Sequence, residues 1–252
     1  MRSILIFVFL GVLLLGSVGV ALGEMMSSVG VSRGDVFRYD YTCYFTSNDP
    51  DAVPPASFSS INQTDYFMIN VTGVSGASVN FDTTLRGLNG SESFGVCNMD
   101  VGTGTASISG YGGPSQASNF YFMTRNVGMM GRMFPSASGS PTINDTLMMN
   151  YAGGQRLTGY LVTNTNQTGI MIQSDFYFDQ TTGMMVEWRQ HNVQTNGILQ
   201  TNSTQMMQIM SSSVWTVPEF PFSLAVSALI VSTIITGLAK VIVRKRGRSL
   251  ES

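Results

Sequence analysis

Cys43 and Cys97 are the side chains whose chemistry is easiest to anticipate from this sequence. The chain has no other cysteine, and its one histidine lies far along the sequence, so the four soft ligands of a structural zinc site are missing. In an oxidising compartment an even pair favours a disulfide. Closing a loop of about 54 residues would stabilise the fold by roughly 4 kcal/mol. We therefore expect a Cys43–Cys97 disulfide.

Catalytic and cation-binding side chains are sparse. His191 lies in the expected strand "VEWRQHNV", where a lone histidine is typical of a surface residue. Asp175, Asp179 and Glu187 lie near an expected turn and could bind a hard cation. The turn lacks the D-x-D-x-D-G series of a calcium loop, so we favour turn-forming carboxylates. Motifs of serine hydrolases, zinc proteases and nucleotide-binding loops are absent from the sequence, and we expect a non-enzymatic protein without a cofactor.

Methionine thioethers are soft ligands that suit Cu(I). The chain has 17 methionines, with neighbouring pairs at 25–26, 129–130, 148–149, 184–185 and 206–207. A pair in a strand points its side chains to opposite faces, which disfavours chelation, and methionine also fills irregular cores. We favour packing, with an apolar groove as the alternative.

The elements that must position these residues have the pattern of β-strands. Alternating runs divided by Gly, Asn and Ser occur at 35–45, 65–74, 77–87, 92–102, 142–151, 155–164, 169–179, 184–193 and 198–210. In "SDFYFD", Phe176 and Phe178 share one face of a strand, as in a sheet with one buried side. The Gly- and Ser-rich stretch 102–118 predicts a flexible connector and a sub-boundary, and 119–136 predicts a helical turn. We predict an all-β domain over 24–215, with antiparallel meanders forming one curved sheet or two packed sheets.

The charge of this middle region restricts its partners. Between Glu24 and Ala239 there is no lysine, and seven arginines face fourteen acidic residues, a net charge of about −7. Nucleic acid is therefore an unlikely partner. Six N-x-S/T sequons predict glycosylation, although a Thr- and Asn-rich β surface also produces them by accident; they are Asn62, Asn70, Asn89, Asn144, Asn166 and Asn202.

Both ends of the chain are apolar. Residues 1–23 have a positive start at Arg2, an apolar run and small residues before the end, which predicts a cleaved signal peptide; an uncleaved anchor is the alternative. Residues 222–243 are long enough to cross a membrane as a transmembrane helix, with Lys240 near one end. A basic cluster follows at 244–252, and by the positive-inside rule it stays in the cytoplasm while the β domain is outside. The cluster consists of Arg244, Lys245, Arg246 and Arg248.

A family resemblance rests on these last residues. Residues 216–221 contain Pro218, Glu219, Phe220 and Pro221, and the apolar span and the basic cluster follow in order. This arrangement resembles the PEF-CTERM sorting signal of archaeal surface proteins. The resemblance implies recognition and cleavage by an archaeosortase and attachment to the archaeal envelope. Lys240 and Glu251 depart from the pattern, which leaves cleavage open.

The expected function follows from location more than from any site. We expect a single-pass protein of the cell surface that acts as a structural or interaction module beside S-layer or other envelope proteins. The hairpin "FYFDQTTGMMVEW" also resembles the corresponding hairpin of lipoprotein-carrier domains of the LolA and LppX kind. That resemblance implies the alternative function, a curved sheet that carries lipid or another apolar ligand.

Overall fold

The computed structural model describes residues 29–111, 113 and 120–215. The expected signal peptide, sorting motif, membrane span and basic cluster lie outside the described residues. Within them, no helix is both long and apolar enough to span a bilayer. The described chain contains these elements in order: β1 (Val36–Ser47), α2 (Ala56–Ile61), β2 (Thr64–Ser75), β3 (Ser78–Gly87), β4 (Glu92–Asp100), β5 (Thr105–Gly110), β6 (Asp145–Tyr151), β7 (Gly154–Gln167), β8 (Ile170–Asp179), β9 (Met185–Asn196) and β10 (Leu199–Ser212).

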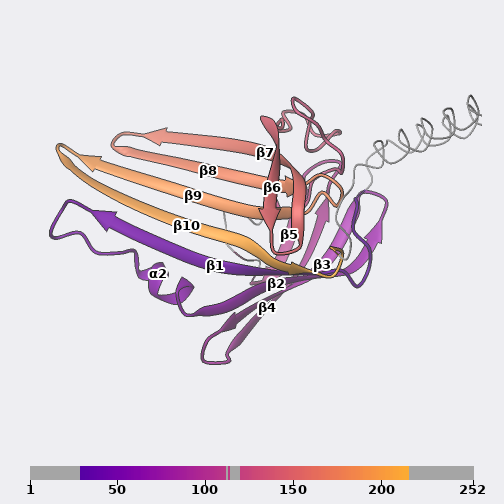
Figure 1. Ribbon diagram of the computed structural model, residues 1–252, viewed down its shortest axis with the longest axis horizontal. Coiled ribbons are helices and arrows are strands. Elements are labelled where there is room, and N and C mark those ends of the chain that lie inside the picture. Colours follow the sequence, from indigo (N-terminus) through magenta and orange to yellow (C-terminus); the bar gives the residue numbers. More distant parts are fainter. Residues whose placement is uncertain (1–28, 112, 114–119, 216–252) are drawn as a thin grey trace, which may run out of the picture. The chain divides into compact units, whose positions relative to one another are not determined.

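All ten strands form one antiparallel sheet in the order β5-β4-β3-β2-β1-β10-β9-β8-β7-β6. It consists of two five-stranded meanders, β1–β5 and β6–β10, and the first strand pairs with the last at its centre. In Figure 1, β2–β4 run at a steep angle to β7–β10, so the sheet is strongly twisted. The predicted all-β fold of antiparallel meanders is confirmed, as one sheet and not as two packed sheets.

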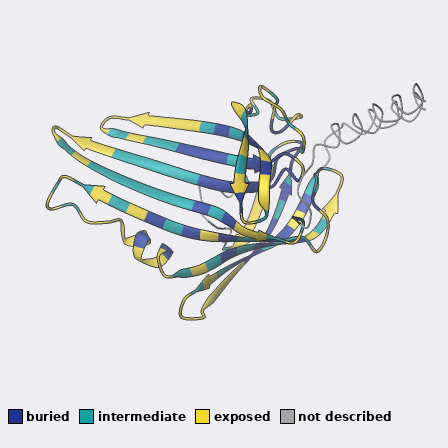
Figure 2. Cartoon of the chain, viewed as in Figure 1, coloured by how far each residue is buried: buried dark blue, intermediate teal, exposed yellow. Residues whose placement is uncertain are grey.

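The core lies on one face of this sheet, which we call the inner face. Phe67 and Phe81 are buried there and contact the inner segment, residues 120–144, which crosses this face. Tyr121 and Phe122 of that segment are fully buried, with ring centroids 5.8 and 5.2 Å from Phe81. Figure 2 shows buried residues at one end of β7–β9 and half-buried or exposed residues at the other. The inner segment therefore fills only part of the inner face.

A tight turn after β8 holds the inner segment in place. Gly183 has a φ of +70°, and a Cβ there would collide with the carbonyl oxygen of Met123. The amide of Met123 donates a hydrogen bond of 2.8 Å to the Gly183 carbonyl. Only glycine combines this left-handed conformation with so close a backbone approach.

The structure differs from the sequence-based expectation between residues 102 and 136. Thr105–Gly110, expected within a flexible connector, forms β5 because its short alternating run pairs with β4. Residues 120–136, expected to contain a helical turn, form bends, turns and isolated bridges such as Phe122–Met184. The helix of the described chain is α2, which the strand pattern did not indicate.

The outer face of the sheet buries a charged group beside the β6–β7 hairpin. Glu187 is fully buried and forms an ion pair with Arg189. Gln208 donates a hydrogen bond of 3.1 Å to the same carboxylate.

Trp215, the last described residue, packs against the β6–β7 hairpin. Its ring lies 6.0 Å from the ring of Tyr151, and the Arg156 guanidinium is 4.8 Å from the Trp215 ring. The end of the described chain is thereby fixed to the sheet.

Replacing Phe81 tests the packing of the inner segment. Phe81→Ala should lower the free energy of unfolding by about 3–5 kcal/mol, because it leaves a cavity against Tyr121 and Phe122. The matched control is Phe94→Ala on the neighbouring strand, where the ring is 63% exposed and the change should stay within about 0.5 kcal/mol. Denaturant unfolding measures both. Equal effects of the two substitutions would contradict the described core.

Candidate functional site

The candidate site lies where β1 extends beyond the end of its pairing with β2. The two strands pair only over Val36–Tyr39, and beyond that point β1 pairs only with β10. The short helix α2 follows Pro54 and Pro55, and it covers the exposed side of β1 with the buried side chains of Phe58 and Ile61. α2 is only six residues long, and a space remains beneath it.

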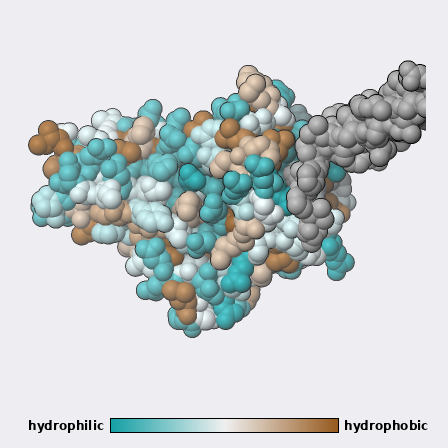
Figure 3. Space-filling model, viewed as in Figure 1, coloured by the Kyte–Doolittle hydropathy of each residue, from teal (hydrophilic) through white to brown (hydrophobic). Residues whose placement is uncertain are grey.

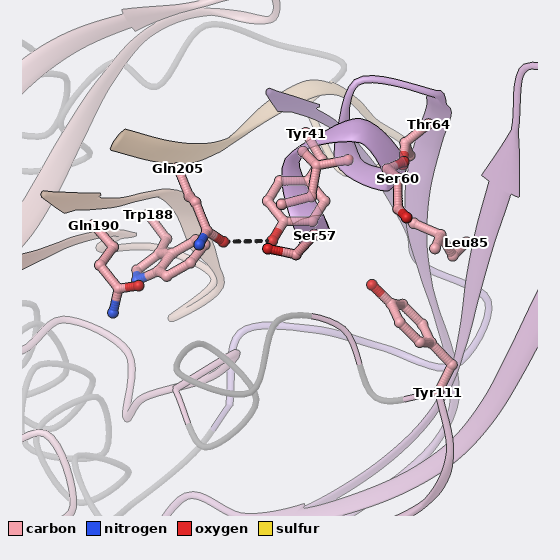
Figure 4. Close-up of a pocket in the computed structure, with 10 residues that line it drawn as sticks. Tyr41, Ser57, Ser60, Thr64, Leu85, Tyr111, Trp188, Gln190 and Gln205 are labelled. Atoms are coloured by element: carbon pink, nitrogen blue, oxygen red, sulfur yellow. Dashed lines mark hydrogen bonds between the residues drawn. The ribbon is translucent and has the colours of Figure 1, made fainter. Parts of the chain in front are cut away.

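This space is a cavity of about 460 Å³ on the inner face, between α2 and strands of both meanders (Figure 4). Its lining contains three aromatic residues, two amides, three hydroxyls and two aliphatic residues. These are Tyr41, Tyr111 and Trp188; Gln190 and Gln205; Ser57, Ser60 and Thr64; Ile61 and Leu85. None of these lining residues is acidic, basic or a histidine, so the lining of the cavity is uncharged.

On the β1 side of the cavity, a hydrogen bond and a ring contact hold the wall together. The Tyr41 hydroxyl donates a hydrogen bond of 2.8 Å to Oε1 of Gln205, which orients both side chains. The Tyr41 ring lies 6.4 Å from the ring of Trp188, and Trp188 is only 1% exposed. Burial raises the pKa of Tyr41, so its hydroxyl stays protonated and remains a donor at neutral pH. The arrangement can bind a neutral ligand by ring contacts and hydrogen bonds.

The predicted Cys43–Cys97 disulfide is wrong for this structure, in which both cysteines are buried free thiols. Cys43 lies in β1 and Cys97 in β4, with β2 and β3 between them in the sheet. Three interstrand spacings of about 4.8 Å place the Cα atoms far beyond the roughly 7 Å that a disulfide spans. Cys43 Sγ instead lies 3.4 Å from the carbonyl oxygen of Phe58, beneath α2.

The carboxylates near the β8–β9 turn have separate structural roles. Asp179 accepts hydrogen bonds from the amide and hydroxyl of Thr182 within the turn. Asp175 accepts a bond of 2.8 Å from the Tyr160 hydroxyl on the outer face. No cluster of three metal-ligating side chains occurs among the described residues, and His191 lies 3.0 Å from the Thr204 hydroxyl on the outer face.

The remaining sequence-predicted positions are dispersed. Of the sequon asparagines, Asn62, Asn89, Asn144 and Asn166 are exposed, while Asn70 and Asn202 are half-buried. Met184 and Met185 are both buried in the core, whereas Met129 and Met130 are exposed on a loop. These two pairs therefore differ in environment, since one fills the core and the other is exposed to solvent.

Sequence reasoning missed the cavity. Its signal was present in the alternate positions of β9 and β10, where Trp188 precedes Gln190 and Gln205 precedes Met207. Alternation alone shows that these side chains share a face, but not that α2 leaves space above them. In the comparisons with known proteins, no family model matches the chain, and no curated protein matches it.

The thiols provide a direct test of the separation of Cys43 and Cys97. Burial raises the pKa of both, so little thiolate forms near pH 8 and N-ethylmaleimide should label the native protein slowly. After unfolding in guanidinium chloride without reductant, mass spectrometry should show two added labels. A sample reduced before unfolding is the control. Labelling that appears only after reduction would establish the disulfide and contradict the structure.

Proposed function

We propose that this chain is a surface-displayed binding protein, with a non-enzymatic β domain outside the cell and a C-terminal membrane span. The domain takes its ligand in the cavity at Trp188. The span at 222–243 and the basic residues that follow support the orientation, and the resemblance to the PEF-CTERM tail supports an archaeal envelope and processing by an archaeosortase. Envelope or S-layer proteins are the proposed neighbours.

The cavity is the observation that carries the binding role. A purely structural module would fill its inner face, as the inner segment does over Phe67 and Phe81. Here a space of about 460 Å³ remains, which is within the usual range of small-molecule sites. Its aromatic wall can hold a ligand, and the amides and hydroxyls that make up half of its lining can orient it.

An apolar carrier is the less favoured alternative. Ile61, Leu85 and Trp188 would suit an acyl chain, but Gln190 and Gln205 line the same space. Tyr41 and Ser174 each bond one atom of these amides. Hydrocarbon would remove water from the remaining amide atoms, at about 1–3 kcal/mol for each atom left unpaired. Figure 3 shows a face on which hydrophobic residues form small separate groups among hydrophilic ones. That face does not favour docking on a lipid surface.

Epitope tags test the orientation. A tag inserted between Asn196 and Gly197, in the exposed β9–β10 turn, should bind antibody on intact cells. A tag after Ser252 should bind only in lysed cells, or be lost if the tail is cleaved, because the basic cluster is cytoplasmic. Antibody binding to the Ser252 tag on intact cells would reverse the proposed topology.

Blocking the cavity tests the binding role. The full chain, purified from its own membranes, should carry a ligand that native mass spectrometry detects as added mass. Ser57→Phe places a ring in the cavity and should abolish that mass. Ser59→Phe, on the same helix but outside the lining, should retain it. Absence of added mass in the parent protein, or equal retention in both variants, would argue against a cavity ligand.

A further inference from the structure

The inner face continues beyond the cavity along the free ends of β1 and β7–β10. Cross-strand register arranges its side chains in rows that run across the five strands. The row at the cavity wall is apolar and consists of Tyr41, Met207, Trp188, Phe176 and Leu161. The next row is mostly polar and consists of Cys43, Gln205, Gln190, Ser174 and Thr163.

Two more rows lead toward the strand ends. The nearer is Phe45, Ser203, Asn192, Ile172 and Thr165; the farther is Ser47, Thr201, Gln194, Ile170 and Gln167. We call the last three rows the amide face. From Gln190 to Gln194 it extends about 13 Å, at about 3.3 Å per residue. All its residues except Cys43 and Ser174 are half-buried or exposed, so most of it can meet a ligand.

The amide face holds no charged side chain. Its polar groups are amides and hydroxyls, and Phe45 and the two isoleucines place apolar surface among them. The outer face of the same strands does carry charge, at Asp175 and Arg189. The two faces of these strands therefore differ in charge: the amide face is uncharged, and the outer face is not.

Two buried polar atoms lack partners, one in the row at the cavity wall and one two rows farther along the amide face. Nε1 of Trp188 and Oδ1 of Asn192 have no hydrogen-bond partner among the described residues. Trp188 is 99% buried, since its exposed fraction is 1%. A buried donor or acceptor without a partner costs about 1–3 kcal/mol, so each favours a rearrangement that supplies one. One is a donor and the other an acceptor, so the two rows leave an unpaired atom of each kind.

The chemistry of this surface restricts its ligand. A charged ligand would find no counter-charge among these residues. An acyl chain would leave a line of amides unpaired. A sugar has hydroxyls that both donate and accept, as an amide side chain requires, and C–H faces that pack on aromatic rings such as Tyr111 and Phe45. Figure 4 shows Tyr111 across the cavity from Gln205 and Trp188, so a ring placed between them would have both kinds of contact.

We propose that the cavity and the amide face together form a binding site for a neutral oligosaccharide, with one sugar ring in the cavity at Trp188 and further rings along Gln190, Asn192 and Gln194. This inference rests on the proposed binding function and names its ligand class. The saccharide is either a free chain or the neutral glycan of a neighbouring glycoprotein.

Calorimetric titration of the full chain in phosphocholine nanodiscs, which contain no sugar detergent, tests the site. The probes are maltohexaose, cellohexaose and chitohexaose, with hexagalacturonate as the charged comparison. At least one neutral probe should bind, and hexagalacturonate should bind at least tenfold more weakly. Gln190→Leu and Gln205→Leu should each weaken binding about tenfold or more, because each leaves sugar hydroxyls unpaired. Gln200→Leu, exposed on the opposite face of β10, should leave the affinity unchanged.

A second arm distinguishes the two sources of saccharide. The same protein is titrated with a glycoprotein bearing neutral high-mannose glycans, before and after deglycosylation. If the protein binds the glycoprotein only while the glycan is attached, and more tightly than it binds the free hexasaccharides, the site is assigned to glycoproteins. If it binds the free hexasaccharides more tightly, the site is assigned to free chains. Thermal melting of each variant confirms that it is folded.

Three results would overturn the inference. They are no binding of any neutral saccharide, free or attached; preference for hexagalacturonate; and unchanged affinity in folded Gln190→Leu and Gln205→Leu variants. If saccharides fail but Ser57→Phe removes a ligand mass from the native protein, the binding function stands and the ligand class is wrong. If both experiments fail, the binding function fails as well.

Discussion

The antiparallel pairing of β1 with β10 is the constraint on which the rest of the domain depends. It runs from Phe37–Ser212 to Ser47–Thr201 and is the strand pair that joins the two meanders. Every other strand pair connects sequence neighbours, whereas this one closes a loop of about 160 residues. Loop-closure entropy makes such a contact late and slow to form, and it also makes the two halves one cooperative unit once formed.

The cavity is a consequence of the same pairing. Because β10 holds β1 over its full length, β1 extends past the end of its contact with β2, and its free side needs cover. α2 covers it with two buried side chains, and the remaining space is bounded by residues from both meanders: Tyr41 and Leu85 from the first, Trp188 and Gln190 from the second. Each half alone would lack one wall of the site.

The sequence predicted most of the strands, because alternation is a local pattern. It did not predict the features that depend on contacts between residues far apart in the chain. Alternation placed nine of the ten strands and put Phe176 and Phe178 on one buried face, where their rings now stack with centroids 6.4 Å apart. It missed β5, because the glycine and serine content of 102–118 is typical of a linker, and the strand is defined only by its pairing with β4. The separation of Cys43 from Cys97 depends on strand order, which no local pattern encodes. The cavity likewise depends on where α2 ends and how far β1 outruns β2.

The position of Trp215 has a mechanical consequence. Its ring is packed against Tyr151 and Arg156, and the chain reaches it directly from β10. Tension applied from beyond Trp215 first loads these contacts and then passes to β10, which is hydrogen-bonded on both sides, to β1 and to β9. Those bonds lie perpendicular to the pull, so they bear the load together in shear and do not open one after another. A pull on this end of the domain is thereby shared between two strand pairs, β10–β1 and β10–β9.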